Sequence, residues 1–311
     1  MAMKLNGHSR LKKQRDRVLL TMCIPAMLKL FIFSYLPMIG IYLAFVDYSP
    51  RKGLASEFIG WKNFEFFFKS GDALQIIGTT IGTNFLFIII GLILAVLLAL
   101  FMNEVRNKTF LKFVQGVSFI PYFLSWLVVG YLFSAFLDNY GLISKIVSKA
   151  TGIKDYSFYT SSDHWLTILT VANMWKSVGV TAVIYLANII SIDKEYYEAA
   201  DLDGATWLQK VYYVTLPFLV PMICVMTLMN IGNIVRSDFG LFFFVTRNSG
   251  PVMRVFEVID TYVYKLTMES SASDAVQRSA AAGLLQSITG MALVVGSNAV
   301  VKKINKESSL F

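Results

Sequence analysis

Long apolar runs separated by short polar segments dominate this chain. A helix needs about 20 consecutive apolar residues to cross the hydrocarbon core of a bilayer, and six runs are long enough. Prolines interrupt the first, third and fifth runs, which is tolerable because neighbouring helices can satisfy the freed backbone groups. The pattern predicts an all-α, polytopic membrane protein with six transmembrane helices, at about 18–46, 73–103, 113–137, 165–190, 214–235 and 279–301.

The composition agrees with a membrane protein and leaves little room for catalysis. Hydrophobic residues make up 56% of the chain and charged residues 15%, with a mean hydropathy of +0.59, whereas charged residues make up about a quarter of a soluble domain. The two histidines and two cysteines are scattered and lack metal-ligand spacing. No glycine-rich phosphate loop or nucleophile elbow occurs. We therefore expect no catalytic residue, metal site or cofactor in this chain.

The distribution of Lys and Arg predicts the orientation in the membrane. Residues 1–17 hold six basic residues against one acid, and residues 103–112 and 302–311 are also basic. Cytoplasmic segments carry such an excess, so both termini are expected in the cytoplasm, and the net charge of +8 requires no nucleic-acid partner. The expected organisation is a basic cytoplasmic segment over 1–17, a transmembrane domain over 18–301 and a basic cytoplasmic tail over 302–311.

One cytoplasmic segment departs from this trend. Between the fourth and fifth spans, residues 191–213 carry five acids and only two lysines. Asp193 can cap a first helix, Gly204 can end it, and Thr206 and Gln209 have capping-box spacing for a second helix that continues into the fifth span. The pattern predicts a helix–turn–helix bracket with small residues on its surface, which suits close docking in a groove of a partner.

The core of this bracket reads EAADLDGA over residues 198–205, followed by a proline after an apolar stretch. It resembles the EAA loop of ABC importer permeases, in which the loop is a coupling helix that docks on a cytoplasmic ATPase. Val211 stands where that family often has an aromatic residue, a departure that bears on packing. The resemblance implies a coupling role for seven residues: Glu198, Ala199, Ala200, Asp203, Gly204, Ala205 and Pro217.

Flanking stretches extend the resemblance over nearly the whole chain. YLPM at 35–38, GWKNF at 60–64 and VIDTYVY at 258–264 are similar to carbohydrate permeases of type I importers, including those for oligosaccharides from complex polysaccharides. The resemblance implies a bacterial cell-membrane complex with a second permease, two ATP-binding subunits and an external solute-binding protein. ATP and Mg would bind to the partner subunits. We expect the second permease to be a different chain, so that the pair is a heterodimer, and a pair of copies of this chain stays open as the alternative.

Polar residues inside the spans are candidates for the solute path, because such residues are costly in lipid and usually functional. Trp175 and Lys176 could contact a sugar, or Lys176 could have a structural role by pairing with a carboxylate in the bundle or by snorkelling outward. Lys29 is better explained by snorkelling or an ion pair. The span-five candidates could line the path or hold the span to a neighbour. The full set of path candidates is Trp175, Lys176, Asn230, Asn233, Arg236, Asp238, Tyr122 and Tyr185.

The expected function is therefore a permease for a sugar or oligosaccharide. The alternatives are an ABC permease for a non-sugar solute, an integral-membrane enzyme and an ion-coupled transporter. An enzyme would need a cluster of acids or histidines at one membrane face, yet His8 and His164 are expected on opposite sides. Outside the membrane, GWKNF predicts a short interfacial helix. Residues 239–245 (FGLFFFV) are too short to span and are expected to be re-entrant or interfacial.

Overall fold

The computed structural model describes residues 5–304, apart from 70, 72, 154–155 and 269–273. Most of the described residues are helical, and six helical stretches are long and apolar enough to cross a membrane, which confirms the predicted fold class. The chain consists of two compact units, each held together by its own internal contacts. The six stretches are Arg15–Phe45, Ala73–Glu104, Trp126–Thr151, Trp165–Ile190, Trp207–Gly232 and Ala275–Lys303.

The first unit comprises Met1–Phe66 and Ser271–Leu284. Its elements are a long helix, a short antiparallel hairpin and the beginning of a further helix. The long helix passes from α-helical through π-helical to 3-10 geometry, and a proline stands near the start of the 3-10 segment. The elements in chain order are α1 (Leu5–Leu30), η1 (Phe31–Tyr35), η2 (Leu36–Phe45), β1 (Val46–Asp47), η3 (Gly53–Ala55), β2 (Glu57–Phe58) and α2 (Lys62–Lys69).

A buried amide fastens α2 to the end of the long helix. The Nδ2 group of Asn63 donates to the carbonyl oxygens of Ala44 and Val46, both at 3.0 Å. The ring of Phe45 packs against Trp61 and Phe64, with centroids 5.4 Å away in each case. The helix predicted from GWKNF is therefore present. Its position at a membrane interface stays a prediction.

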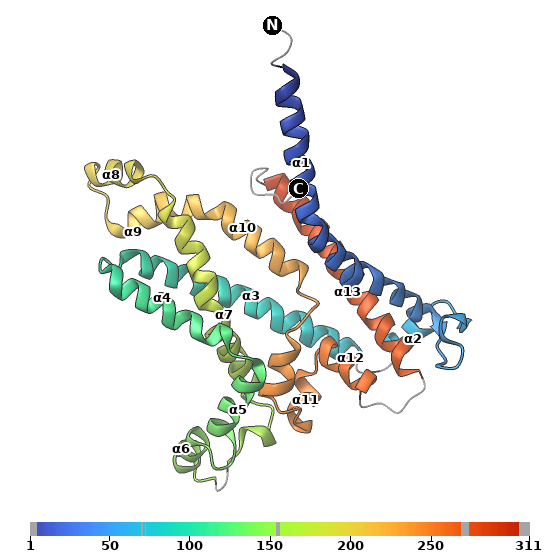
Figure 1. Ribbon diagram of the computed structural model, residues 1–311. Coiled ribbons are helices and arrows are strands. Elements are labelled where there is room, and N and C mark those ends of the chain that lie inside the picture. Colours follow the sequence, from blue (N-terminus) through green and yellow to red (C-terminus); the bar gives the residue numbers. More distant parts are fainter. Residues whose placement is uncertain (1–4, 70, 72, 154–155, 269–273, 305–311) are drawn as a thin grey trace. The chain divides into compact units, whose positions relative to one another are not determined.

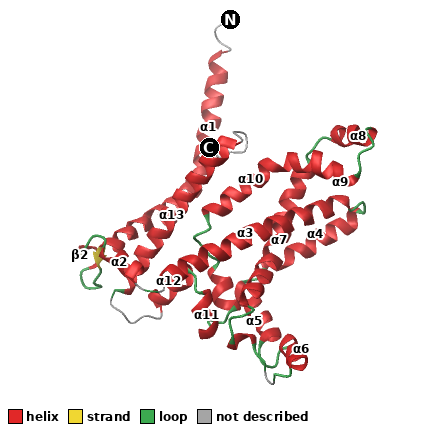
Figure 2. Cartoon of the chain, turned by 180° about the vertical axis from the view of Figure 1, so that it is seen from behind, coloured by secondary structure: helices red, strands yellow, loops and turns green. Residues whose placement is uncertain are grey.

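The core of the second unit (Phe67–Ser270 and Leu285–Phe311) consists of helices that lie side by side. Figures 1 and 2 show α3 (Ala73–Glu104) and α4 (Lys108–Phe123) running alongside each other, and α7 (Trp165–Ile190) packs against both. Small residues permit the close approach that helices in lipid need. Ala95, Ala99 and Ala182 are completely buried between α3 and α7. A Cβ at Gly179 would collide with the backbone of α4.

The predicted third span, 113–137, is wrong as a single helix. The chain leaves helical geometry at Leu124 and Ser125, between α4 and α5 (Trp126–Leu137). The stretch that is long enough to span runs instead from Trp126 through α6 (Leu142–Thr151). Ser125 caps α5 by accepting from the Val128 amide at 3.4 Å. At the end of α4, backbone carbonyl groups accept hydrogen bonds from a side chain on α7. That side chain, Lys176, is 52 to 55 residues away in sequence.

Shorter helices form the two ends of the second unit. Figure 1 shows α8 and α9 at one end and α5 and α6 at the other. α13 contributes to both units. The elements not yet given are η4 (Phe158–Thr160), α8 (Lys194–Leu202), α9 (Trp207–Lys210), η5 (Val211–Thr215), α10 (Leu216–Gly232), η6 (Leu241–Val245), α11 (Gly250–Phe256), α12 (Ile259–Met268) and α13 (Ala275–Ile304).

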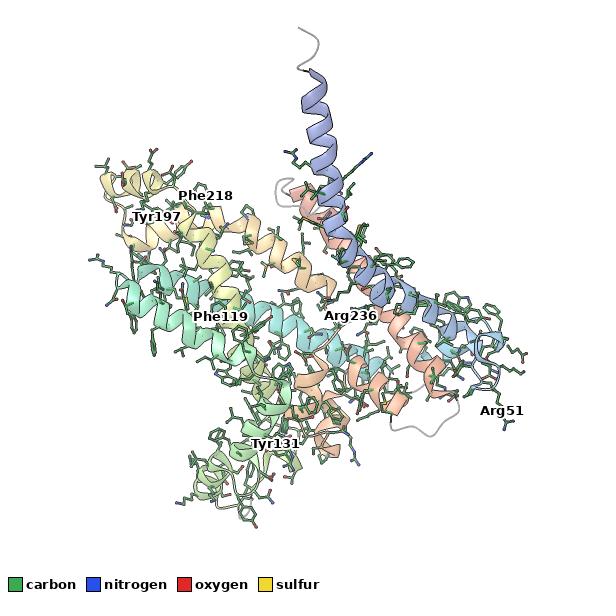
Figure 3. All side chains as sticks on the ribbon, viewed as in Figure 1. Arg51, Phe119, Tyr131, Tyr197, Phe218 and Arg236 are labelled. Carbon is green, nitrogen blue, oxygen red and sulfur yellow. The ribbon has the colours of Figure 1, made fainter. Side chains whose placement is uncertain are left out.

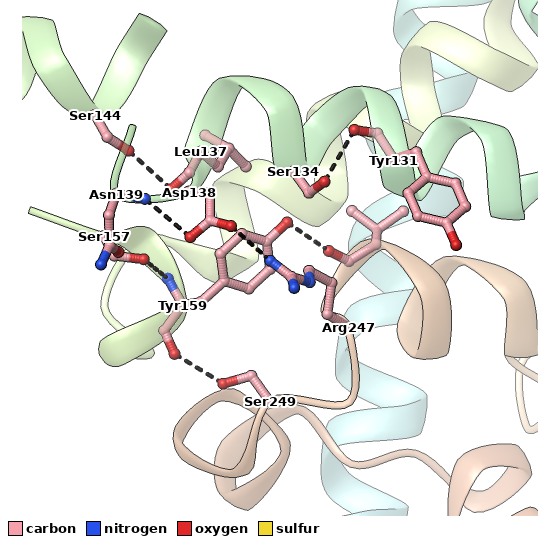
Figure 4. A network of polar contacts seen from close by, with 11 residues as sticks. Tyr131, Ser134, Leu137, Asp138, Asn139, Ser144, Ser157, Tyr159, Arg247 and Ser249 are labelled. Carbon is pink, nitrogen blue, oxygen red and sulfur yellow. Dashed lines mark hydrogen bonds and ion pairs between the residues drawn. The ribbon is translucent and has the colours of Figure 1, made fainter. Parts of the chain in front are cut away.

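A polar network holds η6 against the segment around α5 (Figure 4). Arg247 Nη1 forms an ion pair with Asp138 Oδ2 at 2.8 Å, and its guanidinium lies 5.3 Å from the centre of the Tyr159 ring. The Tyr159 hydroxyl donates to the carbonyl oxygen of Val245 at 3.2 Å. Burial raises the pKa of Tyr159 to about 12, although Arg247 opposes this shift. η6 is too short to span, as predicted, and its residues Leu241 and Phe242 are fully buried within the protein.

Candidate functional site

The bracket between the fourth and fifth spans has the predicted local structure. The Asp193 carboxylate accepts from the Glu195 amide at 3.2 Å and caps α8. Gly204 has a φ of +73°, a conformation that glycine adopts without steric cost. The Gln209 side chain accepts from the Thr206 amide at 2.7 Å, as in a capping box. Both short helices and the turn between them therefore follow from signals within the segment.

The bracket is anchored to the helix that follows it. The Tyr197 hydroxyl lies 3.0 Å from the hydroxyl of Thr215 in η5, whereas the ion pair of Lys210 Nζ with Asp201 Oδ1, at 2.7 Å, joins the two helices of the bracket to each other. The ring of Tyr196 contacts that of Phe218, with centroids 4.9 Å apart. Figure 3 shows Tyr197 and Phe218 at this end of the unit.

Six of the seven residues of the resemblance belong to this bracket, and none of the seven is fully buried. Glu198, Ala199, Asp203 and Gly204 are exposed, Ala200 and Ala205 are half-buried, and Pro217 is exposed in the first turn of α10. Leu202, which no sequence motif singled out, is 90% exposed between Asp201 and Asp203. An exposed leucine among carboxylates is the mixture that a docking surface presents, with an apolar centre and a polar rim.

A polar cavity of about 240 Å³ lies among α3, α7 and α10. Its lining brings together five of the eight path candidates: Tyr185, Asn230, Asn233, Arg236 and Asp238. The cavity has further polar residues that the sequence analysis missed: Asn84, Asn173, Ser177, Thr181 and Thr227. Three of these, at 173, 177 and 181, repeat every fourth residue and so share one helix face. This spacing is visible in the sequence and could have predicted a polar face on the fourth span.

The segment after α10 leaves helical geometry and is held from three sides. The Asn84 amide on α3 lies 2.8 Å from the Ile234 carbonyl oxygen and 3.0 Å from that of Arg236. The Ser237 amide donates to Asp260 Oδ2 at 2.7 Å, and the Gln286 amide on α13 also reaches Asp260, at 3.2 Å. Figure 3 shows Arg236 at this end of α10. We call residues 233–238 the clamped segment.

Electrostatics at the clamped segment centre on Asp260. Burial raises the pKa of its carboxyl group above the ordinary value of 3.8, while hydrogen bonds from Ser237 and Gln286 and the charge of Arg236 oppose the shift. Arg236 itself donates to Ser287 Oγ at 3.2 Å. Asp238 accepts from the Trp126 indole and from the Gly240 amide. Arg236, Asp238 and Asp260 are therefore each hydrogen-bonded to a residue on another segment of the chain.

Three path candidates lie outside the polar cavity. Trp175 lines a separate apolar cavity between α5 and α7, and Tyr122 is exposed on α4. Lys176 Nζ donates to the carbonyl oxygens of Pro121, Tyr122 and Leu124 at the end of α4, and lies 5.1 Å from the centre of the Trp126 ring. An ammonium has three protons to donate, so this arrangement supports the structural alternative for Lys176.

Comparisons with known proteins agree with this arrangement. Residues 88–306 match the family described as "Binding-protein-dependent transport system inner membrane component". Protein LplB of Bacillus subtilis (strain 168) is 32% identical over 94% of this chain and 91% of its own. The "Polygalacturonan/rhamnogalacturonan transport system permease protein YteP" of the same organism is 31% identical over 96% of this chain and 91% of its own.

A solved structure shares the fold over nearly the entire chain. It is described as a "bacterial ABC transporter involved in the import of the acidic polysaccharide alginate", and its matching chain is 30% identical, with a TM-score of 0.82 over 95% of this chain and 99% of that one. The matched family region also includes the whole bracket and most of the cavity lining. The chain therefore belongs to the family of inner membrane components of binding-protein-dependent transport systems, and it is a multi-pass membrane permease.

Proposed function

We propose that this chain forms the translocation path of an ATP-driven importer for an oligosaccharide, in the cytoplasmic membrane of a bacterium with both termini inside. An external solute-binding protein delivers the solute. A second permease completes the path, and two ATP-binding subunits carry ATP and Mg. The descriptions of two relatives, which refer to polygalacturonan/rhamnogalacturonan and to alginate, support the substrate class.

The observation that carries the proposal is one continuous helical stretch. It runs from Trp207 in the bracket to Gly232, directly before the clamped segment. At about 1.5 Å per residue, its 26 residues reach about 39 Å. The backbone is helical from the bracket to the clamped segment, so a displacement at one end passes through consecutive helical turns to the other. Docking of an ATPase on the bracket would thereby shift the residues that line the cavity.

The lining of the cavity suits a hydroxyl-rich solute. Amides and hydroxyl groups both donate and accept hydrogen bonds, and the cavity presents Asn173, Ser177 and Asn230 together with the phenol of Tyr185. Arg236 adds a guanidinium, which pairs with carboxylates in a two-pronged geometry. This combination supports a sugar chain, including one that carries uronate groups.

The coupling role is tested at Gly204 with a matched pair of variants. Gly204→Val places a β-branched residue at positive φ, which is strongly unfavourable, whereas Gly204→Asn places a residue that tolerates this conformation. No heavy atom lies within 4 Å of the added Cβ, so only the backbone turn is challenged. We expect the complex containing Gly204→Val to assemble in the membrane but to lose most substrate-stimulated ATP hydrolysis and uptake, while Gly204→Asn retains both.

Two measurements decide the result. Co-purification with an ATP-binding subunit and a second permease reports assembly, and uptake into proteoliposomes reports coupling. Normal uptake with Gly204→Val would show that the turn does not set the docking geometry. Uptake by the purified chain alone, without ATP, would refute the importer assignment itself.

A further inference from the structure

A second polar cavity lies behind the bracket, on the side where the spans end. It has a volume of about 510 Å³, twice that of the polar cavity described above. Its walls come from the end of α3, the start of α4, the end of α7, α8 and the stretch from α9 through η5. Neither the solute path nor the docking surface of the bracket accounts for it.

Cationic side chains dominate the charge of this cavity. Arg106, Lys108, Lys194 and Lys210 line it, and Glu104 is the one acid in its lining. Lys210 pairs with Asp201, whereas Arg106, Lys108 and Lys194 form no ion pair within the described part of the chain. The three cations without an ion pair come from two segments that are distant in sequence, and the fold brings them to one cavity.

Apolar side chains lie directly beside these cations. Leu111 lies about one turn into α4 beyond Lys108, and Leu186 and Ile190 lie in the last turns of α7. The indole of Trp207 joins them and is 40% exposed, and indoles are enriched where lipid headgroups meet water. The lining thus combines cations at the ends of spans with apolar positions one turn deeper.

We propose that this cavity binds the headgroup of an anionic phospholipid of the cytoplasmic leaflet. The phosphate is held by Arg106, Lys108 and Lys194, and the start of an acyl chain lies against Leu111 and Leu186. Basic cavities between spans on the cytoplasmic side take anionic lipid headgroups for this electrostatic reason. A soluble anion would satisfy the cations but would leave the apolar part of the lining uncovered.

A lipid at this place would brace the bracket. Lys108 belongs to α4 and Lys194 to α8, so one phosphate between them links the bracket to the core of the unit by charge-assisted hydrogen bonds. Membrane composition would then tune how firmly the bracket is held. This inference concerns lipid and not solute, and its test below does not depend on transport.

The test measures binding of short-chain lipids to the purified full-length chain in neutral detergent. The probes are dihexanoyl phosphatidylglycerol, dihexanoyl phosphatidylcholine and inorganic phosphate. The variant Lys108→Gln/Lys194→Gln removes two cavity cations, and Lys302→Gln/Lys303→Gln removes two exposed cations at the end of α13. All four lysines are exposed, so both variants should keep their fold, which circular dichroism checks.

We expect saturable binding of phosphatidylglycerol that weakens about fivefold for each removed cavity cation, and no loss in the α13 variant. A spin label on the phosphatidylglycerol headgroup should quench a larger fraction of the tryptophan fluorescence in the wild type than in Trp207→Phe, because Trp207 lines the cavity. Equal weakening in both double variants would overturn the site, because it would show only general charge attraction. Phosphatidylcholine or inorganic phosphate binding as tightly as phosphatidylglycerol would overturn the assignment to an anionic lipid.

Discussion

The bracket at 191–213 and the clamped segment at 233–238 are both polar interruptions of an apolar chain, and they are stabilised in opposite ways. In the bracket, most bonds join residues within ten positions of each other, as from Asp193 to Glu195 and from Lys210 to Asp201. In the clamped segment, the amide of Asn84 contacts a carbonyl group 150 residues away. The two segments stand at opposite ends of one continuous helical stretch.

This difference has a physical cause. The bracket is largely exposed, so water can satisfy the backbone groups that its caps leave free. The clamped segment includes the buried residues Ile234, Val235 and Ser237, where an unpaired carbonyl or amide is costly. Its bonds must therefore come from whichever elements lie beside it. The bracket can change its contacts at low cost, and the clamped segment cannot.

The largest expected effect comes from removing the distant amide. Asn84→Leu should lower the free energy of unfolding by about 3 kcal/mol, because it removes the donor from the carbonyl oxygens of Ile234 and Arg236 and from the Ser237 hydroxyl. Asn230→Leu is the matched control, since Asn230 lines the same cavity but makes no side-chain hydrogen bond among the described residues. Thermal unfolding in micelles measures both. Equal stability of the two variants would remove the distinction between the clamped segment and the rest of the cavity.

A second long-range contact should behave in the same way. Lys176→Met keeps the length of the side chain but removes the donor that three carbonyl groups of α4 share. We expect a loss of about 2 kcal/mol in stability, as for hydrogen bonds to a charged group, while the solute concentration for half-maximal uptake stays the same. Lys145→Met, on an exposed position of α6, serves as control. A changed solute dependence with full stability would instead place Lys176 on the path.

A local change in the bracket should have a smaller and more confined effect. Asp193→Ala removes the cap of α8 and should cost about 1 kcal/mol locally, because only one turn loses its acceptor. Amide hydrogen exchange should become faster over α8 while the midpoint of global unfolding stays unchanged. Asp193→Ser retains a capping oxygen and should exchange like the wild type. Global destabilisation by Asp193→Ala would mean that the bracket is part of the cooperative core.

The smallest effect is a dependence on pH through Asp260. Because its pKa is raised in the folded state, its contribution to stability is complete below the ordinary value of 3.8 and is lost as the pH rises through the raised pKa. Hydrogen bonds from Ser237 and Gln286 oppose the shift, which keeps the loss small. Asp260→Asn should flatten this decline in the unfolding midpoint. An identical pH profile in that variant would show that another group causes the dependence.

Local patterns predicted the parts of the molecule that depend on neighbours in sequence. The length of the apolar runs located four of the six spans to within about four residues and the fifth to within about seven, and the caps at Asp193 and Thr206 located the bracket. The helix face at 173, 177 and 181 was accessible by the same means. Each of these signals acts over one or two helical turns, so no knowledge of the fold is needed to use it.

The sequence by itself therefore determined the fold class, the number of spans and the family. Tertiary structure alone decided that the third span breaks at Leu124 and that Lys176 serves the broken end of α4. It also decided that Asn84 and Asp260 hold the clamped segment. The reason is that a buried polar group needs a partner but does not specify where in the chain that partner lies. Only the packing of the helices brings the two together.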